Sequence, residues 1–141
     1  MSQRVLRLEI PAGLEEAVLV GPAVRGIAEA VGLERARAAE VGLCLQEAAV
    51  NAVEHACGLR REEVVSVVLS IESGVLRAEV RDRGRAMPEE RLEEARRSEP
   101  EPLAERGRGL FMITQLAESV TYSSGDGENV LRMSFPIPGA G

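Results

Sequence analysis

The alternation of apolar and polar residues predicts a first strand near the start of the chain. In residues 4–10, RVLRLEI, Leu6, Leu8 and Ile10 fall on one face, while the charged residues between them fall on the other. A period of two is typical of a strand with one buried face. Pro11 is expected to end it.

Two helical patterns follow this strand. Residues 14–31 carry apolar side chains at helical spacing, but Gly21 and Pro22 interrupt the pattern and leave its start uncertain. Residues 34–56 form the longest helical pattern of the chain. Gly58 is expected to stop that helix, because glycine readily adopts the left-handed conformation that follows a helix end.

Alternation returns in two places and predicts two hairpins. Residues 64–71 and 75–82 flank Ser73 and Gly74, and residues 119–122 and 129–135 flank the turn SSGDGE. Short alternating runs joined by such turns are typical of antiparallel pairs.

The stretch between these hairpins predicts two further helices. Residues 88–97 form a short charged helix, with Pro88 in its first turn, and residues 98–106 form a polar loop. Helical spacing resumes over residues 107–117. The order of elements predicts one α+β domain over residues 1–141, with helices on one face of a mainly antiparallel sheet.

Composition narrows the class of protein. A chain of 141 residues has the length of one ordinary domain. It is 45% hydrophobic but only 2% aromatic, so the core must be aliphatic. No stretch is long and apolar enough to span a bilayer, and the first residues lack the apolar segment of a secretion signal. We therefore expect a cytoplasmic protein that does not contact a membrane.

Charge excludes several kinds of chemistry. The formal charge of −6 argues against direct nucleic-acid binding, because proteins that bind phosphate backbones gather basic residues. All 17 basic residues are arginine, which excludes a lysine-based phosphate loop and a Schiff-base lysine. Cys44 and Cys57, with one histidine in the chain, cannot build a four-ligand zinc site and are expected to be reduced and buried.

The first candidate for chemistry lies on the long predicted helix. Glu47, Asn51 and His55 advance only about 40° at each step and form a stripe beside an apolar face rich in alanine. A carboxylate at the border of the core can act as a base. Taken alone, the same stripe is more often an ordinary hydrated helix face.

The second candidate is Asp82 at the end of a predicted strand, followed by Gly84. The carboxylate could accept a hydrogen bond from an exocyclic amine, and the glycine would allow a ligand to approach closely. Many Asp-x-Gly sequences are simply turns.

The third candidate is a glycine pair that opens a helix. Gly107 and Gly109 leave backbone N–H groups free where the helix dipole favours an anion, and Arg106 and Arg108 add forked donors. A glycine pair before a helix often only shapes the connection.

In this order and spacing, the segments E-x-x-x-N-A-x-x-H, D-x-G and G-x-G-L resemble the N, G1 and G2 boxes of the GHKL ATPase superfamily. Within it, the sequence looks most like the anti-sigma factor serine/threonine kinases of bacterial partner switching. The resemblance spans nearly the whole chain and implies a Bergerat-type fold, with helices packed over a mixed sheet. Its length is also that of the stand-alone members.

The resemblance also implies roles for individual residues. Asn51 would bind Mg²⁺, Glu47 would be the general base, and Asp82 would accept the adenine amine beside Gly84. The phosphate cradle would use the segment from Gly107 through Gly109 to the amide of Leu110, and residues 98–106 would form a lid. Arg106 or Arg108 would meet the γ-phosphate; the sequence does not decide between them. Ala86 departs from the pattern, because a fuller box has a second glycine there.

The implied function is an ATP- and Mg²⁺-dependent kinase that sequesters a sigma factor and phosphorylates a serine on an anti-anti-sigma protein of STAS type. The family also implies a homodimer, for which the helix around Arg25 offers one surface. The alternatives are a nucleotide-dependent binding module without kinase activity, an isolated ATP-binding domain of a histidine kinase, and a globular domain with coincidental motifs. A histidine kinase is disfavoured because no dimerisation helix with a phospho-accepting histidine is evident, and His55 lies on the ATP-site helix itself.

Overall fold

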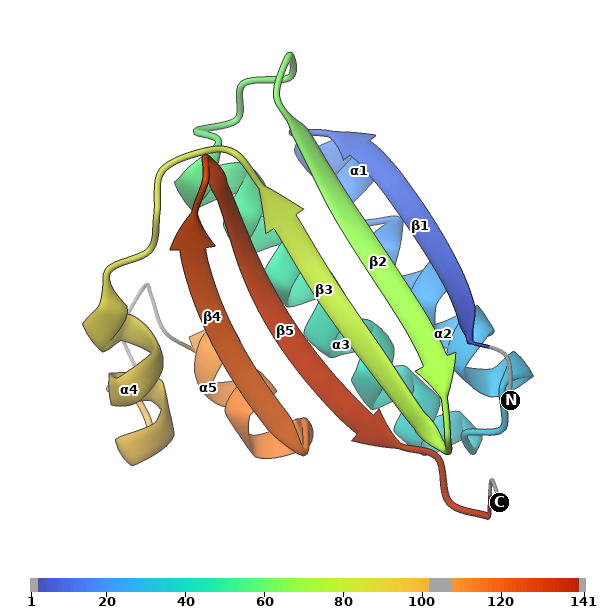
Figure 1. The fold of residues 1–141 in the computed structure, drawn as a ribbon. Helices are drawn as coiled ribbons and strands as arrows, with labels where there is room; N and C mark the ends of the chain where they lie inside the picture. The colour runs from blue at the N-terminus through green and yellow to red at the C-terminus, as the bar shows by residue number, and fades with distance from the viewer. Residues whose placement is uncertain (1–2, 102–107, 140–141) are drawn as a thin grey trace.

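The sheet is a single antiparallel layer. The computed structural model describes residues 3–101 and 108–139. Its strands run in the order β1-β2-β3-β5-β4, and all four pairings are antiparallel (Figure 1). The strands are β1 (Arg4–Pro11), β2 (Val64–Glu72), β3 (Val75–Asp82), β4 (Ser119–Gly125) and β5 (Glu128–Pro136).

Helices cover one face of this sheet (Figure 1). The helical elements are α1 (Leu14–Ala17), α2 (Val20–Ala30), α3 (Arg35–Asn51), the π-helical turn η1 (Ala52–Ala56), α4 (Glu89–Arg97) and α5 (Arg108–Leu116). Of these, α4 lies beside α5 at the β4 edge of the sheet rather than over its face (Figure 1). The predicted α+β class is therefore confirmed. None of the helices in the described ranges is both long and apolar enough to cross a membrane.

The mixed sheet implied by the resemblance is wrong for this chain. Between β1 and β2 the chain passes down α2 and back along α3, so it returns to the end of the sheet where β1 finished (Figure 1). The next strand must then run antiparallel, whereas a crossover through one helix would have made it parallel. The strands β3 and β4 point the same way, but β5 lies between them.

Two predicted helices differ in detail. The helix predicted over residues 14–31 is two helices, and the chain breaks at Val18 and Leu19 rather than at Gly21 and Pro22. Pro22 is tolerated because it lies in the first turn of α2, where a backbone N–H has no partner within the helix. The helix predicted over residues 34–56 covers the correct range, but its last five residues form η1.

Both predicted hairpins form. Ser73 and Gly74 make the first turn, and both have positive φ. The second turn is shorter than SSGDGE, because only Asp126 and Gly127 lie between the strands. Two-residue turns with positive φ match the twist of the strands they join, which explains why β4 and β5 extend further than the alternation indicated.

The core between the sheet and the helices is aliphatic, as predicted. Leu6, Leu8 and Ile10 all pair with core-facing residues of β2. Leu8 and Ile10 pack against the core as predicted, but Leu6 remains 42% exposed. Cys44 and Cys57 are buried and free. The largest fully buried side chains include Phe135, Leu45, Leu69, Leu76 and Ile113.

Candidate functional site

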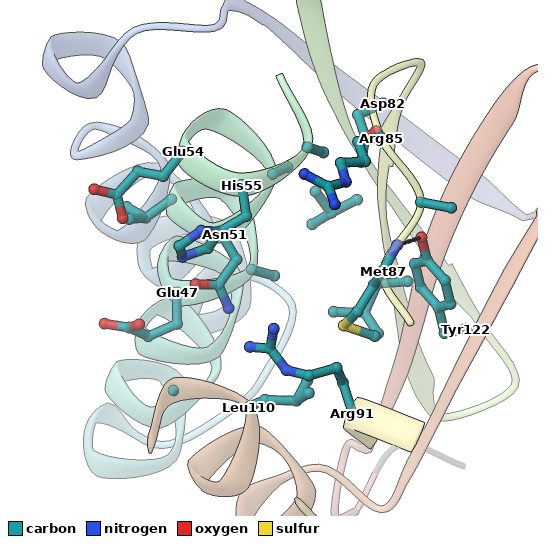
Figure 2. A pocket seen from close by; sticks show the side chains of 18 of the residues that line it. Glu47, Asn51, Glu54, His55, Asp82, Arg85, Met87, Arg91, Leu110 and Tyr122 are labelled. Atoms are coloured by element: carbon teal, nitrogen blue, oxygen red, sulfur yellow. Dashed lines mark hydrogen bonds between the residues drawn. The ribbon is translucent and has the colours of Figure 1, made fainter. Parts of the chain in front are cut away.

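One cavity of about 380 Å³ lies between the C-terminal half of α3, the end of β3 with the loop that follows it, and the first residues of α5. Its size is that of a small-molecule pocket. Figure 2 shows the side chains of Asn51, from α3, and Arg85, from the loop after β3, pointing into it from two sides. Most of the residues selected from the sequence line it: Glu47, Asn51, His55, Asp82, Arg108, Gly109 and Leu110.

The stripe on α3 forms one wall. Buried Leu45, Ala48 and Ala49 hold the helix against the core, so Glu47 and Asn51, one turn apart, remain half-buried at the cavity surface. His55 is more exposed and lies on η1. Glu47 and Asn51 therefore lie at the border of the core, as predicted, whereas His55 lies at the surface.

The π-helical turn connects α3 to the loop after β3. The carbonyl of Ala56 accepts a hydrogen bond of 2.8 Å from the N–H of Arg85. Gly84 lies so close to this carbonyl that any side chain would overlap it. π-Turns within α-helices are frequent at functional sites. Here, the turn provides the carbonyl that anchors residues 84–85 beside the cavity.

Three polar residues lie side by side in a row on β3, β5 and β4, on the face of the sheet that packs against the helices. Asp82, Asn129 and Ser124 are directly paired on β3, β5 and β4. The Asn129 amide donates to Asp82 Oδ1 at 2.7 Å and to the carbonyl of Gly84 at 3.0 Å, and accepts from Ser124 Oγ at 2.6 Å. The row therefore fixes the orientation of the Asp82 carboxylate.

One oxygen of Asp82 is left for a ligand. Oδ1 accepts from Asn129 and also from the N–H of Gly84 at 2.9 Å. Oδ2 has no hydrogen bond to the described residues. It is therefore not fully buried, because every fully buried side-chain oxygen or nitrogen among these residues has a hydrogen-bond partner. Because Asp82 lines the cavity, Oδ2 is an open acceptor on its surface.

The electrostatics of Asp82 are dominated by burial. The residue is only 8% exposed, and desolvation raises the pKa of its carboxyl above the ordinary 3.8. The hydrogen bonds from Asn129 and Gly84 oppose this rise, and the charges of Glu128 and Glu63 add to it.

The opposite wall is made by the loop after β3 and by the sheet. The N–H of Met87 donates to the Tyr122 hydroxyl at 2.9 Å, and both side chains line the cavity (Figure 2). This contact ties the loop to β4. Met87 and Tyr122 give this side a largely apolar surface, which suits one face of a planar ring.

The first residues of α5 come directly against α3. A side chain at Gly109 would overlap the carboxylate of Glu47. The two predicted segments, far apart in the chain, therefore meet in space. Arg108 is the first residue of α5 and lines the cavity. Arg106 and Gly107 lie outside the described residues, and so does most of the predicted lid.

Sequence reasoning missed several residues of the site. Asn129 had a usable signal, because it shares strand parity with core residues Leu131 and Met133, where a polar residue is unexpected. For Tyr122, the sequence predicted a place in a strand but gave no signal that it would line a cavity. Arg85, Arg91 and Glu54 also line the cavity. Gly84 supports the loop rather than lining the cavity.

A two-layer sandwich with such a cavity at one end of its helices is the architecture of the GHKL-type ATP-binding domains. Residues 10–135 match the family model of the histidine kinase-like ATPase domain. The chain belongs to this family. No curated protein sequence matches it significantly.

Solved structures share the fold. The RsbU and RsbW domains of Rv1364c from Mycobacterium tuberculosis superimpose with a TM-score of 0.61 and 21% identity. That match covers 94% of this chain but only 33% of the other, so this chain spans about a third of its length. The SiaB-SiaC complex from Pseudomonas aeruginosa gives a TM-score of 0.71 at 16% identity, covering 92% of this chain and 88% of that one.

The catalytic domain of the histidine kinase ThkA gives a TM-score of 0.57 at 16% identity, with 97% of each chain covered. At these identities the likeness shows the fold and does not by itself show a shared activity.

Proposed function

We propose that this chain binds ATP in the cavity and transfers the γ-phosphoryl group to a serine of another protein. The observation that supports this most is that an open carboxylate oxygen of Asp82 and an amide–carboxylate pair, Asn51 and Glu47, converge on one cavity. Phosphoryl transfer needs little covalent help and depends on positioning and charge neutralisation. A site assembled from rigid elements suits that requirement.

The adenine end of the site would be the row across the sheet. Oδ2 of Asp82 would accept the exocyclic amine, and Met87 and Tyr122 would contact the ring. The phosphates would then extend toward Glu47, Arg108, Gly109 and the amide of Leu110. Arg106 and Gly107 are proposed to complete this end.

Asn51 is the proposed ligand of Mg²⁺. Its amide reaches the cavity surface one turn from Glu47, and Mg²⁺ prefers oxygen ligands while keeping several waters and phosphate oxygens. Among the described residues, no three His, Cys, Asp or Glu side chains form a group that could hold a metal ion. When bound, the ion neutralises phosphate charge, which a protein of net charge −6 needs beside a polyanion.

Glu47 is the proposed general base. The serine oxygen forms the new bond to the γ-phosphorus, the bond to the β–γ bridging oxygen breaks, and ADP leaves. The Glu47 carboxylate takes the serine proton. An oriented base contributes about 10²–10⁴-fold to the rate.

The proposed partners are those of a cytoplasmic partner switch: a sigma factor and an anti-anti-sigma protein of STAS type. The resemblance of the three boxes supports this choice, and the shared fold with the RsbW and SiaB chains is consistent with it. A homodimer is proposed on the same ground. Light scattering after size exclusion should give twice the 15.1 kDa of the chain; a mass of one chain would contradict the dimer.

Transfer of ³²P from labelled Mg·ATP to STAS-domain proteins of the same organism tests the kinase. We expect label that survives acid but not alkali, as on serine. Glu47→Gln should retain ATP binding and lose most transfer. The matched control is Glu40→Gln, also on α3, which removes only a surface pair with Arg37.

Three results would contradict the proposal. Acid-labile phosphate would indicate histidine and support the histidine-kinase alternative. Nucleotide binding without transfer would support a binding module. Undiminished transfer by Glu47→Gln would reject the general base.

A further inference from the structure

Arg91 is not among the residues of the proposed site, yet its side chain enters the cavity. It belongs to α4, a helix on which the sequence showed no motif. Figure 2 shows its guanidinium reaching from α4 toward the wall formed by Glu47 and Asn51. The residue is half-buried.

Among the described residues, Arg91 forms no side-chain hydrogen bond or ion pair, and the other arginines of α4 do. Arg96 bonds to Glu93 at 3.1 Å and to the carbonyl of Val120, and Arg97 bonds to the carbonyl of Glu93. A half-buried guanidinium that faces a cavity and forms no ion pair with the described residues is suited to an anionic ligand.

The helix that carries Arg91 is anchored on several sides. Leu92 and Ala95 are buried in the core. The carbonyl of Ala95 accepts from Thr114 Oγ1 of α5 at 3.4 Å, and Arg96 holds α4 to β4. The start of α4 follows the loop that Tyr122 fixes through Met87. Arg91 is therefore presented from a fixed helix, which lowers the cost of ordering it on a ligand.

The position of Arg91 indicates which part of a bound nucleotide it would contact. Asp82 lies beside Arg85 in the part of the cavity away from Glu47, and the Arg91 guanidinium lies on the Glu47 side (Figure 2). Building on the proposed function, we propose that Arg91 binds the terminal phosphates of the nucleotide, across the cavity from Asn51. It would supply a cation from α4 in addition to Arg108 from α5.

Calorimetry with Mg·ATP, Mg·ADP and adenosine tests this role. Arg91→Ala should weaken Mg·ATP binding by about 10- to 100-fold, the range of a charge-assisted hydrogen bond, and leave adenosine binding nearly unchanged. Arg91→Lys should restore part of the loss, because lysine keeps the charge without the fork. Arg97→Ala, which removes an equal charge from the same helix, is the matched control and should bind like wild type.

The outcomes separate this inference from the function on which it rests. If wild type binds no Mg·ATP, the proposed function fails and the role of Arg91 fails with it. If wild type binds and Arg91→Ala binds equally well, only the role of Arg91 is overturned. Equal weakening of adenosine and Mg·ATP would also overturn it, because that pattern indicates a structural effect on the whole cavity.

Discussion

Gly84 packs directly against the backbone carbonyl of Ala56, the last residue of the π-helical turn that follows α3. The neighbouring N–H of Arg85 donates to that same carbonyl. The two walls of the cavity that come from α3 and β3 are thus joined through main-chain atoms. The glycine of the Asp-x-Gly segment is needed for this contact.

Gly84→Ala should therefore lower both the stability of the protein and its affinity for Mg·ATP. The new methyl group would meet backbone atoms that cannot rotate away, so the loop or η1 must shift. We expect a loss of roughly 1–3 kcal/mol in the free energy of unfolding, together with weaker binding of Mg·ATP. Urea unfolding and calorimetry measure both. Gly26→Ala is the control, because Gly26 lies in α2 with open space around it and alanine there should be neutral or stabilising. Wild-type stability and affinity in Gly84→Ala would contradict the contact.

Asp82→Asn should change the preferred base. The asparagine oxygen would accept from the N–H of Gly84 and from Asn129, as Oδ1 does now. Its NH₂ group would then occupy the place of Oδ2 and face the adenine amine, donor against donor. We expect ATP affinity to fall and the affinity for inosine triphosphate, whose base presents an acceptor there, to rise relative to ATP. Calorimetry with both nucleotides measures the ratio, and an unchanged ratio would show that Asp82 does not contact this edge of the base.

The same substitution isolates the pH dependence that Asp82 causes. Burial raises the pKa of its carboxyl above 3.8 in the folded protein. At pH values between the ordinary pKa and the raised one, Asp82 is protonated in the folded protein but ionised in the unfolded chain. The free energy of unfolding therefore falls as the pH rises through this range. The free energy of unfolding of wild type, minus that of Asp82→Asn, should therefore decrease from about pH 3.8 upward and then level off. An increase over this range would mean that the hydrogen bonds from Asn129 and Gly84 outweigh burial.

Periodicity in the sequence was enough to predict the strands and most of the helices. The strands were predictable because alternation reports directly which face is buried, as in β2 and β3. The turn η1 was not, because AVEHA is equally compatible with an α-helix, and the contact of Ala56 with Gly84 joins segments far apart in the chain. The break before α2 was misplaced because proline was treated as an interruption rather than as a first-turn residue.

The residues of the candidate site also fall into those that the sequence could predict and those that it could not. The stripe of Glu47, Asn51 and His55 was visible because it lies on one helix, and the order of the boxes linked it to Asp82 and Gly109. Contacts across the sheet were invisible to local patterns, so the pairing of Asn129 with Asp82 emerged only from strand register. Arg91 had no signal either, because it is one of many charges on a short helix.

The contact between Gly109 and Glu47 allows stability to be separated from catalysis. A methyl group at residue 109 would overlap the Glu47 carboxylate, which is the flexible end of a side chain and can be displaced without moving the backbone. Alanine is also the better helix former, by about 1 kcal/mol, so Gly109→Ala should be at least as stable as wild type. With the proposed base displaced, we expect kcat for phosphoryl transfer to fall by about 10²–10⁴-fold. KM for ATP should rise as well, because Gly109 also belongs to the proposed phosphate cradle. Gly26→Ala again serves as the control, since it makes the same exchange in a helix remote from Glu47 and should leave kcat unchanged. A stable Gly109→Ala variant with wild-type kcat would mean that the position of the Glu47 carboxylate does not limit the reaction.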